Sequence, residues 1–312
     1  MFGWFAKQTQ VPGWFAASLG EQEFDFAHGE HSSSGKSAIT LYGTHKLDAE
    51  AQGLHKLGQA MHLGQYQCAA LLKPGEYQLL LVEAPNVPKE ELKSAIRWRI
   101  KDMIDYHIDD ATIDVLDIPP EEGSGGRNHQ MFAVAARNDL IQTFVRAFGE
   151  ARIPLSVIDI QETAQRNIAA LYENEDRGVA LAYFAHDWGL LTVTYRGELY
   201  LARRLDIGLQ HLSADSARQE GGALERVAVE IQRTRDHFER QFRSIPLARV
   251  LIAPMPDELG LGEFLRARLG IDSRQIDLRE VLAFDGEGPD ATTQWRLFHH
   301  FGAALRHETK AL

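Results

Sequence analysis

Several stretches of this chain contain the residue types of phosphate-binding and metal-binding sites. Their spacings argue against such sites. Gly29–Ser37 reads GEHSSSGKS and ends in the Gly-Lys-Ser of a phosphate-binding loop. Its first glycine stands one residue too far from Gly35. The residues that follow have a strand pattern, whereas a phosphate-binding loop leads into a helix whose N-terminus holds the phosphate. We therefore predict a polar hairpin loop here.

Histidines and aspartates are also candidates, as metal ligands. His300 and His307 lie about two turns apart on a predicted helix, and no carboxylate joins them or His299 at ligand spacing. An acidic run lacks the turn glycine of a calcium loop and is interpreted as a charged face. It consists of Asp102, Asp105, Asp109, Asp110 and Asp114. We predict no metal site and no catalytic residue.

Composition indicates a globular protein of the cytoplasm. The chain has 312 residues, of which 44% are hydrophobic, enough for two domains with their own cores. A net charge of −11 argues against nucleic-acid binding, which needs a basic face. The single cysteine, Cys68, is expected in a buried strand, as a small core residue instead of a reactive thiol.

The sequence contains no expected membrane span. No run approaches the ~18 to 20 apolar residues that cross a bilayer. The aromatic segment Met1–Lys7 is too short for a signal peptide. A packed or disordered tail is favoured there over a contact with lipid.

Two predicted β-meanders divide the chain into halves 1–178 and 179–312. The first consists of Gly13–Leu19, Gln22–Ala27 and Lys36–Tyr42, and the second of Val179–Phe184, Leu190–Tyr195 and Leu199–Leu205. Helices are expected at Asp48–Met61, Gly222–Arg243, Glu258–Leu269 and Thr293–His307, with short strands at Ala248–Ala253 and Gln275–Leu278. Tyr66–Leu72 and Tyr77–Val82 are expected to form a hairpin. The repeated plan predicts a duplicated α/β architecture.

An additional unit, at about residues 85–154, interrupts the first half. Pro88–Asp105 has helical spacing of apolar residues, with proline suited to the first turn. Strands are expected at Thr112–Ile118 and Met131–Ala136, on either side of the glycine loop Gly123–Gly126. A second helix begins at Asn138 and ends at Gly149. The pattern predicts an inserted helix–strand–strand–helix subdomain.

Short sequence words in this unit and beyond it resemble the PilM and GspL group of actin-like assembly proteins. They are Ala95–Trp98, Ile104–Asp110, Phe132–Ala136, Val157–Asp159, Val229–Arg233 and Phe301–Arg306. The resemblance extends over nearly the whole chain and is nearest to the MshI branch, which serves mannose-sensitive haemagglutinin (MSHA) pili. It implies an actin-like, ribonuclease H-like duplicated ATPase fold. It also implies a role at the inner-membrane platform of a type IV pilus or type II secretion system.

Actin-like ATPases hold phosphates and magnesium with two hairpin turns, typically Asp-x-Gly. In the first turn this chain has Ser18 and Gly20 but no carboxylate. In the second it has Asp187 and Gly189, with the acid displaced from the family position and a bulky tryptophan between them. The glycine pair that approaches the adenosine is replaced by Pro254-Met255-Pro256, and prolines lack the N–H groups a nucleotide could use.

One trace of a nucleotide site remains. Glu230 and Arg233 lie three residues apart on the long helix and hence on one face of it. In actin-like ATPases, an acidic and a basic residue at this spacing flank the adenosine. A surface ion pair is the favoured alternative. Taken together, the residues predict a degenerate ATPase fold without a cofactor. Two alternatives stay open: an ATP–Mg-binding protein of the same fold with nucleotide-regulated assembly, and a kinase of the wider superfamily.

The resemblance also implies partners. It places a peptide groove between the first subdomain and the inserted unit, for the cytoplasmic tail of a PilN-like bitopic membrane protein. Arg97, Trp98 and Arg99 lie off the main apolar face of the helix and are our candidates for this contact. The alternative is that Trp98 packs on the neighbouring sheet. We expect a scaffold at the inner membrane that also meets the pilus platform or motor ATPase, with homodimerisation left open.

Overall fold

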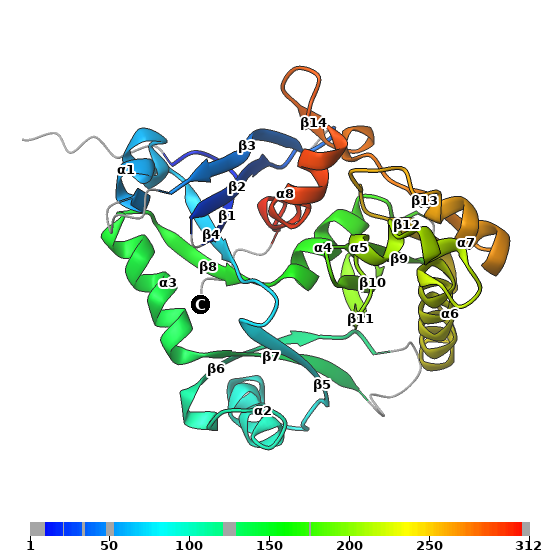
Figure 1. The fold of residues 1–312 in the computed structure, drawn as a ribbon. Coiled ribbons are helices and arrows are strands. Elements are labelled where there is room, and N and C mark those ends of the chain that lie inside the picture. The colour runs from blue at the N-terminus through cyan, green and yellow to red at the C-terminus, as the bar shows by residue number, and fades with distance from the viewer. Residues whose placement is uncertain are drawn as a thin grey trace, which may run out of the picture.

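The computed structural model describes residues 10–20, 22–32, 35–47, 53–120, 129–174 and 176–307, and three sheets organise them (Figure 1). The first has six strands in the order β14-β3-β2-β1-β4-β8. Their bounds are β1 Trp14–Leu19, β2 Glu23–Glu30, β3 Ala38–Lys46, β4 Gln67–Leu71, β8 Leu155–Asp159 and β14 Ala283–Phe284. β1, β2 and β3 form the predicted meander, and β4 and β8 add to it in parallel.

The second sheet repeats the plan of the first. Its order is β11-β10-β9-β12-β13, with the antiparallel meander β9–β11 followed by two parallel strands. The bounds are β9 Gly178–Phe184, β10 Gly189–Tyr195, β11 Glu198–Leu205, β12 Leu247–Ile252 and β13 Asp272–Gln275. The duplicated meander architecture predicted from the sequence is confirmed.

The third sheet corrects one prediction. It has the order β5-β7-β6, from β5 (Tyr77–Glu83), β7 (Gln130–Arg137) and β6 (Ala111–Asp117). The expected hairpin of Tyr66–Leu72 with Tyr77–Val82 is wrong, because β4 lies inside the first sheet and β5 pairs with β7. β4 is buried along most of its length, as suits a strand between two parallel neighbours, whereas β5 is half-exposed at a sheet edge.

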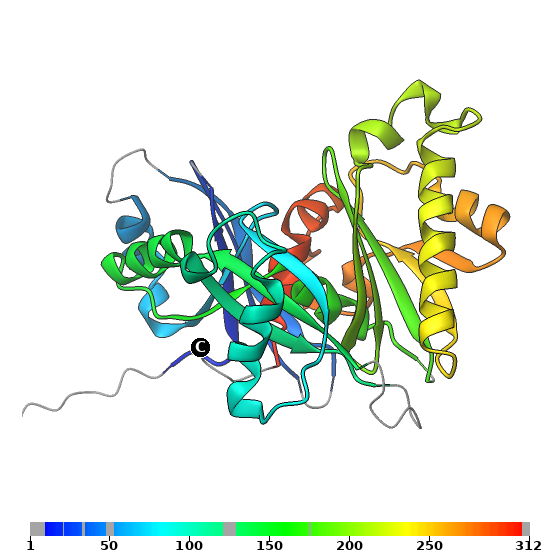
Figure 2. The same ribbon diagram turned by 90° about the horizontal axis from the view of Figure 1, so that it is seen from below.

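Helices cover the sheets according to their apolar faces. α4 (Gln161–Ala170) and α8 (Ala291–Ala304) lie between the two large sheets, as Figure 2 shows. The outer positions belong to α1 (Gly53–Ala60) and α3 (Asn138–Glu150) in the first half, and to α6 (Ala223–Gln241) and α7 (Leu261–Leu269) in the second. α2 (Leu92–Ile100) packs on β5 and β6 through Ile96 and Ile100. α5 (Leu209–Leu212) is a single turn.

Close contact between α4 and α8 joins the halves. A Cβ on Gly302 would lie 2.1 Å from the carbonyl oxygen of Ala164, so only glycine lets the two helices approach this far. The amide of Asn167 donates to the Gly302 carbonyl at 2.9 Å. α8 also packs on β1 and β2, so the end of the described chain returns to the first sheet. The division at residue 178 and the limits 85–154 of the inserted unit stay predictions.

Several element boundaries differ from expectation. The helix predicted at Pro88–Asp105 is a 3-10 turn at Lys89–Glu91 followed by α2, which ends at Ile100. Aspartates at 102 and 105 would meet the negative end of a longer helix. The strand predicted at Gln275–Leu278 is β13, three residues earlier, and β14 was not predicted at all. The predicted loop Gly123–Gly126, the segment Met1–Lys7 and residues 48–52 lie outside the described residues.

Candidate functional site

The first phosphate-type turn lies between β1 and β2. The Gly20 N–H donates to the Glu23 carbonyl at 2.6 Å, which makes the turn tight. The Ser18 hydroxyl is 2.8 Å from Nε2 of His300 on α8, and both residues are buried. Ser18 is therefore directed into the protein, where it holds the turn to the helix behind it.

The second turn joins β9 to β10 and contains Asp187 and Gly189. The Ala185 N–H donates to the Trp188 carbonyl at 2.8 Å. The Trp188 ring packs beside Tyr183, with ring centroids 6.0 Å apart, and the Arg204 guanidinium lies 4.7 Å from its centre. Asp187 is exposed. A Cβ on Gly189 would come within 3.0 Å of two carbonyl oxygens, so this glycine serves backbone packing.

Side chains of α8 connect the two turns. Trp295 Nε1 donates to the Phe184 carbonyl at 2.7 Å, in the strand that leads into the second turn. Arg296 donates to Glu23 at 2.5 Å and to Asp25 at 3.1 Å, in the strand that leaves the first turn. A carboxylate was expected before Gly20 in an active turn, whereas these two carboxylates follow it and were not predicted. Their alternation on β2 was the available signal.

The segment after β12 is built into the core. Ala253 donates to the Ala182 carbonyl at 2.8 Å, and Met255, between the two prolines, is 1% exposed within the core of the second half. Met255 therefore anchors this segment in the apolar core.

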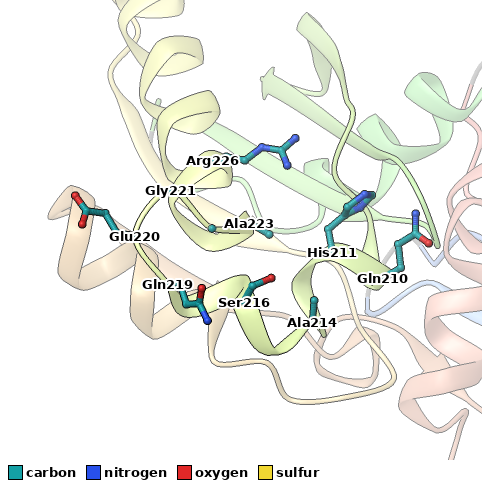
Figure 3. A pocket seen from close by; sticks show the side chains of 10 residues that line it. Gln210, His211, Ala214, Ser216, Gln219, Glu220, Gly221, Ala223 and Arg226 are labelled. Carbon is teal, nitrogen blue, oxygen red and sulfur yellow. The ribbon is translucent and has the colours of Figure 1, made fainter.

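Glu230 and Arg233 form the predicted pair on α6, with a third member. Arg233 Nη1 lies 2.8 Å from Glu230 Oε1, and Arg203 on β11 reaches Oε2 of the same carboxylate at 3.1 Å. Glu230 and Arg233 line a pocket of about 500 Å³ at the end of β11. A neighbouring pocket of about 610 Å³ lies at the start of α6, where Figure 3 shows Arg226 and His211 directed over it and Glu220 pointing away.

Of the six residues predicted for the nucleotide cleft, Glu230 and Arg233 line a pocket beside α6. Neither pocket beside α6 is lined by Ser18, Gly20, Asp187 or Gly189. Within the described ranges, no group of three or more histidine, cysteine or acidic side chains could hold a metal ion. His299 and His300 are buried against α4 and the first sheet, and burial lowers the pKa of His299 to about 3 and of His300 to about 4.

A groove of about 400 Å³ separates the first sheet from the third. β8 is the last strand of the six-stranded sheet and β6 the last strand of the three-stranded one, so each has one edge without a neighbouring strand among the described residues. Residues of both strands line the groove, with others from α2, α4 and the chain after α8. They are Lys89, Leu92, Lys93, Asp114, Val115, Leu116, Val134, Val157, Ile158, Asp159, Ile160, Thr163 and Arg306.

Charges in the groove are largely paired. Asp159 and Arg306 form an ion pair of 2.7 Å, with side chains 5% and 14% exposed. Oδ1 of Asp159 accepts from the Ile160 N–H at 2.9 Å and from the Thr163 hydroxyl. At the rim, Lys93 lies 2.9 Å from Asp114. The remaining lining is mainly aliphatic, which suits an extended peptide with apolar side chains.

Comparison with known proteins decides the family. A sequence model described as type IV pilus assembly protein PilM matches residues 45–243, which is more than half of the chain. The chain belongs to this PilM family. A search of curated protein sequences gave no match.

Solved structures are similar to this chain in fold. The PilM–PilN type IV pilus biogenesis complex is 17% identical, covers 95% of this chain and 97% of that chain, and has a TM-score of 0.69. The cytoplasmic domain of EpsL of the Vibrio cholerae type II secretion system is 15% identical, with 67% and 78% covered and a TM-score of 0.43. A Bacteroides thetaiotaomicron protein with an actin-like ATPase fold is 11% identical, with 96% and 99% covered and a TM-score of 0.47. The chain has the actin-like α/β fold predicted from its sequence.

In this PilM-family chain, the three residues predicted for partner binding lie on α2 and are absent from the lining of the groove. Trp98 is 70% exposed and does not pack on the sheet; the Lys101 ammonium lies 5.7 Å from its ring centre. Arg97 pairs with Asp109 at 3.0 Å, and Arg99 with Glu83 at 3.6 Å. The α2 side of the groove instead consists of Leu92 and Lys93, preceded by Lys89.

Proposed function

We propose that this PilM-family protein is a non-catalytic scaffold of a type IV pilus machine, and that it binds the cytoplasmic tail of a PilN-like bitopic membrane protein in the groove between β8 and β6. The observation that carries the proposal is the pair of unpaired strand edges along an aliphatic groove. A solved relative is a complex of PilM with PilN, which supports the choice of partner.

The groove suits an extended peptide for a physical reason. An edge strand has N–H and C=O groups that no neighbouring strand satisfies, and an added strand can pair with them. β8 has five residues, so a peptide of about five residues at ~3.3 Å each would match its length. Alternate side chains of that peptide would then face Leu92, Val115 or Leu116 on the third sheet and helix.

The absence of catalysis is part of the same proposal. In active actin-like ATPases, the two turns face phosphate and magnesium. Here Glu23 and Asp25 are paired with Arg296, and Trp188 and Trp295 pack at the second turn. These residues do not fit a hydrated magnesium ion, which is held through carboxylates with room for several waters. This supports a scaffold that works without ATP; the pockets beside α6 keep nucleotide binding as the alternative.

Placement at the membrane follows from the partner. Within the described residues, no helix has the length and apolar character needed to span a bilayer. We propose that the protein lies at the cytoplasmic face of the inner membrane through its PilN-like partner. We further propose that the pilus is of the MSHA type and that the protein contacts the platform or motor ATPase. A homodimer is part of the same proposal.

The test is a binding titration with a synthetic peptide of the PilN-like tail. Ile158→Glu and Leu116→Glu introduce a charge on each side of the groove and are expected to abolish binding. Val145→Glu is the matched control, because Val145 is an exposed aliphatic residue, 56% exposed, on α3 and outside the groove. Loss of binding in Trp98→Ala, with binding retained in the groove variants, would move the contact to the outer face of α2.

A further inference from the structure

The two walls of the groove between β8 and β6 are packed against different cores of the protein. On the β8 side, Val157 packs with Trp14 and Ala69 of the first sheet, and Ile158 packs against the core of the first half. On the β6 side, Leu116 lines the groove and packs against the cores of both halves. The wall formed by β8 thus belongs to the first half, whereas the wall formed by β6 is also held by the second half.

The third sheet enters the core of the second half where β6 ends. Ile118, directly after β6, is 1% exposed, and Phe132 on β7 is 4% exposed. Both belong to an apolar core whose other buried members lie between residues 180 and 271. Two residues before Phe132, the side chain of Gln130 accepts a hydrogen bond from Gln241, the last residue of α6. We call this set of contacts the second-half junction.

Leu116 is coupled directly to the apolar part of this junction. It lies opposite Phe132 in the register of β6 with β7, and Ile118 follows it by two positions. Side chains at opposite and at alternate positions share one face of a sheet, and those directly opposite contact each other. Because protein interiors are close-packed, a displacement of Ile118 or Phe132 is passed on to Leu116. The second half therefore helps to set the position of Leu116 in the groove.

The alternative is that the first half alone positions this wall. α3 follows β7 directly, and Val134 lines the groove and packs against the first-half core. The buried contacts favour the second half. Among the described residues of the third sheet, Ala136 is the one buried side chain in the first-half core, whereas the larger Phe132 is buried in the second-half core with Ile118. Larger apolar side chains bury more area and so contribute more to holding the sheet in place.

We infer that the second half of the protein controls binding of the tail in the groove, with Ile118, Phe132 and Gln241 as positioning residues. The inference rests on the groove proposed above as the site of the PilN-like tail. A tail that pairs with β8 and packs on Leu116 joins the first half to a wall held by the second half. Tail binding and the placement of the second half are therefore coupled, and the coupling acts in both directions.

The experiment uses the full ¹⁵N-labelled chain and a synthetic peptide of the PilN-like tail. Gln241→Ala removes the hydrogen bond to Gln130, and Ile118→Val removes one methylene from the buried contact; neither residue lines the groove. Gln232→Ala is the matched control, because Gln232 lies on the same helix but bonds to Asp236 within it. We expect the tail to bind about fivefold more weakly to Gln241→Ala and Ile118→Val. Its affinity for Gln232→Ala should be unchanged.

Two nuclear magnetic resonance measurements separate positioning of the groove from a general loss of stability. In the free protein, Gln241→Ala should shift the amide signal of Leu116, whereas Gln232→Ala should not. In the wild-type protein, the tail should shift the amide signal of Gln241, and Ile158→Glu should abolish this shift together with binding.

The outcomes distinguish this inference from the groove proposal. Unchanged tail affinity in Gln241→Ala and Ile118→Val, with binding lost in Ile158→Glu, would overturn the inference and leave the groove proposal standing. An equal loss of affinity in Gln232→Ala would also overturn it. No binding of the tail to the wild-type protein would overturn the groove proposal. The Leu116 signal needs no peptide, so its lack of response to Gln241→Ala would overturn the junction's role by itself.

Discussion

Removing Arg306 should lower the free energy of unfolding, because Arg306 belongs to a buried ion pair in the floor of the groove. In Arg306→Met, Asp159 keeps its bonds to the Ile160 N–H and the Thr163 hydroxyl but loses its cation at 2.7 Å. Breaking a buried pair by removing one partner costs about 3 to 5 kcal/mol. Because Asp159 retains two donors, we expect the lower end, about 3 kcal/mol.

The assay is urea unfolding of the full chain, followed by tryptophan fluorescence. Trp14 is a local reporter, because the Arg306 guanidinium lies 5.8 Å from its ring centre. Lys93→Met is the matched control: its pair with Asp114 also borders the groove, but the side chains are 58% and 49% exposed, and such pairs contribute about 0 to 1 kcal/mol. The double variant Asp159→Asn with Arg306→Met should lose less than the sum of the two single variants. A loss below about 1 kcal/mol in Arg306→Met would refute the reasoning.

Three further predictions concern the helix between the sheets. Ser18→Ala leaves the buried His300 Nε2 without its hydroxyl and should cost about 1 to 3 kcal/mol in urea unfolding; an unchanged midpoint would contradict the contact. Trp295→Phe removes the bond to the Phe184 carbonyl and should cost about 1 kcal/mol, with faster hydrogen exchange in the second turn; unchanged exchange there would show that α8 does not hold it. Folded pKa values of about 3 for His299 and about 4 for His300 lie below the unfolded value of 6.5. The unfolded chain therefore binds more protons, and stability should be full above pH 6.5 and fall by up to ~1.4 kcal/mol per pH unit for each histidine as the pH drops towards 4. His299→Asn should flatten that slope, and an equal slope in both proteins would contradict the assignment.

Local patterns in the sequence were sufficient for much of the fold. Alternating residues predicted both meanders, and helical spacing predicted α6 within two residues of its ends. Cys68 is fully buried in β4 as expected, and burial raises its thiol pKa to about 12. These features depend on neighbours in the chain, which is why the sequence shows them.

Pairings between distant segments could not be predicted in the same way. The return of α8 to the first sheet, and the pairing of β14 with β3, join residues more than 240 apart. β5 has a strand pattern that fits either β4 or β7 as a partner, and only the three-dimensional arrangement decides. The bridge from Arg296 to Glu23 and Asp25 is of the same kind, so the carboxylates beside the first turn were missed.

The groove was expected from the resemblance, but its lining was not. Trp98, Arg97 and Arg99 were selected because they lie off the apolar face of a helix, and this criterion does not say which structure that outer face meets. Lys89, Leu92 and Lys93 line the groove because the N-terminal part of α2 lies beside β6.

The central claim is most directly tested by calorimetric titration of the purified protein with ATP–Mg²⁺ and, separately, with the PilN-like tail peptide. We predict saturable heat from the peptide, lost in Ile158→Glu and kept in Val145→Glu, and no heat from ATP–Mg²⁺ at millimolar concentration. Tight ATP–Mg²⁺ binding, or peptide binding that survives Ile158→Glu and Leu116→Glu, would contradict it.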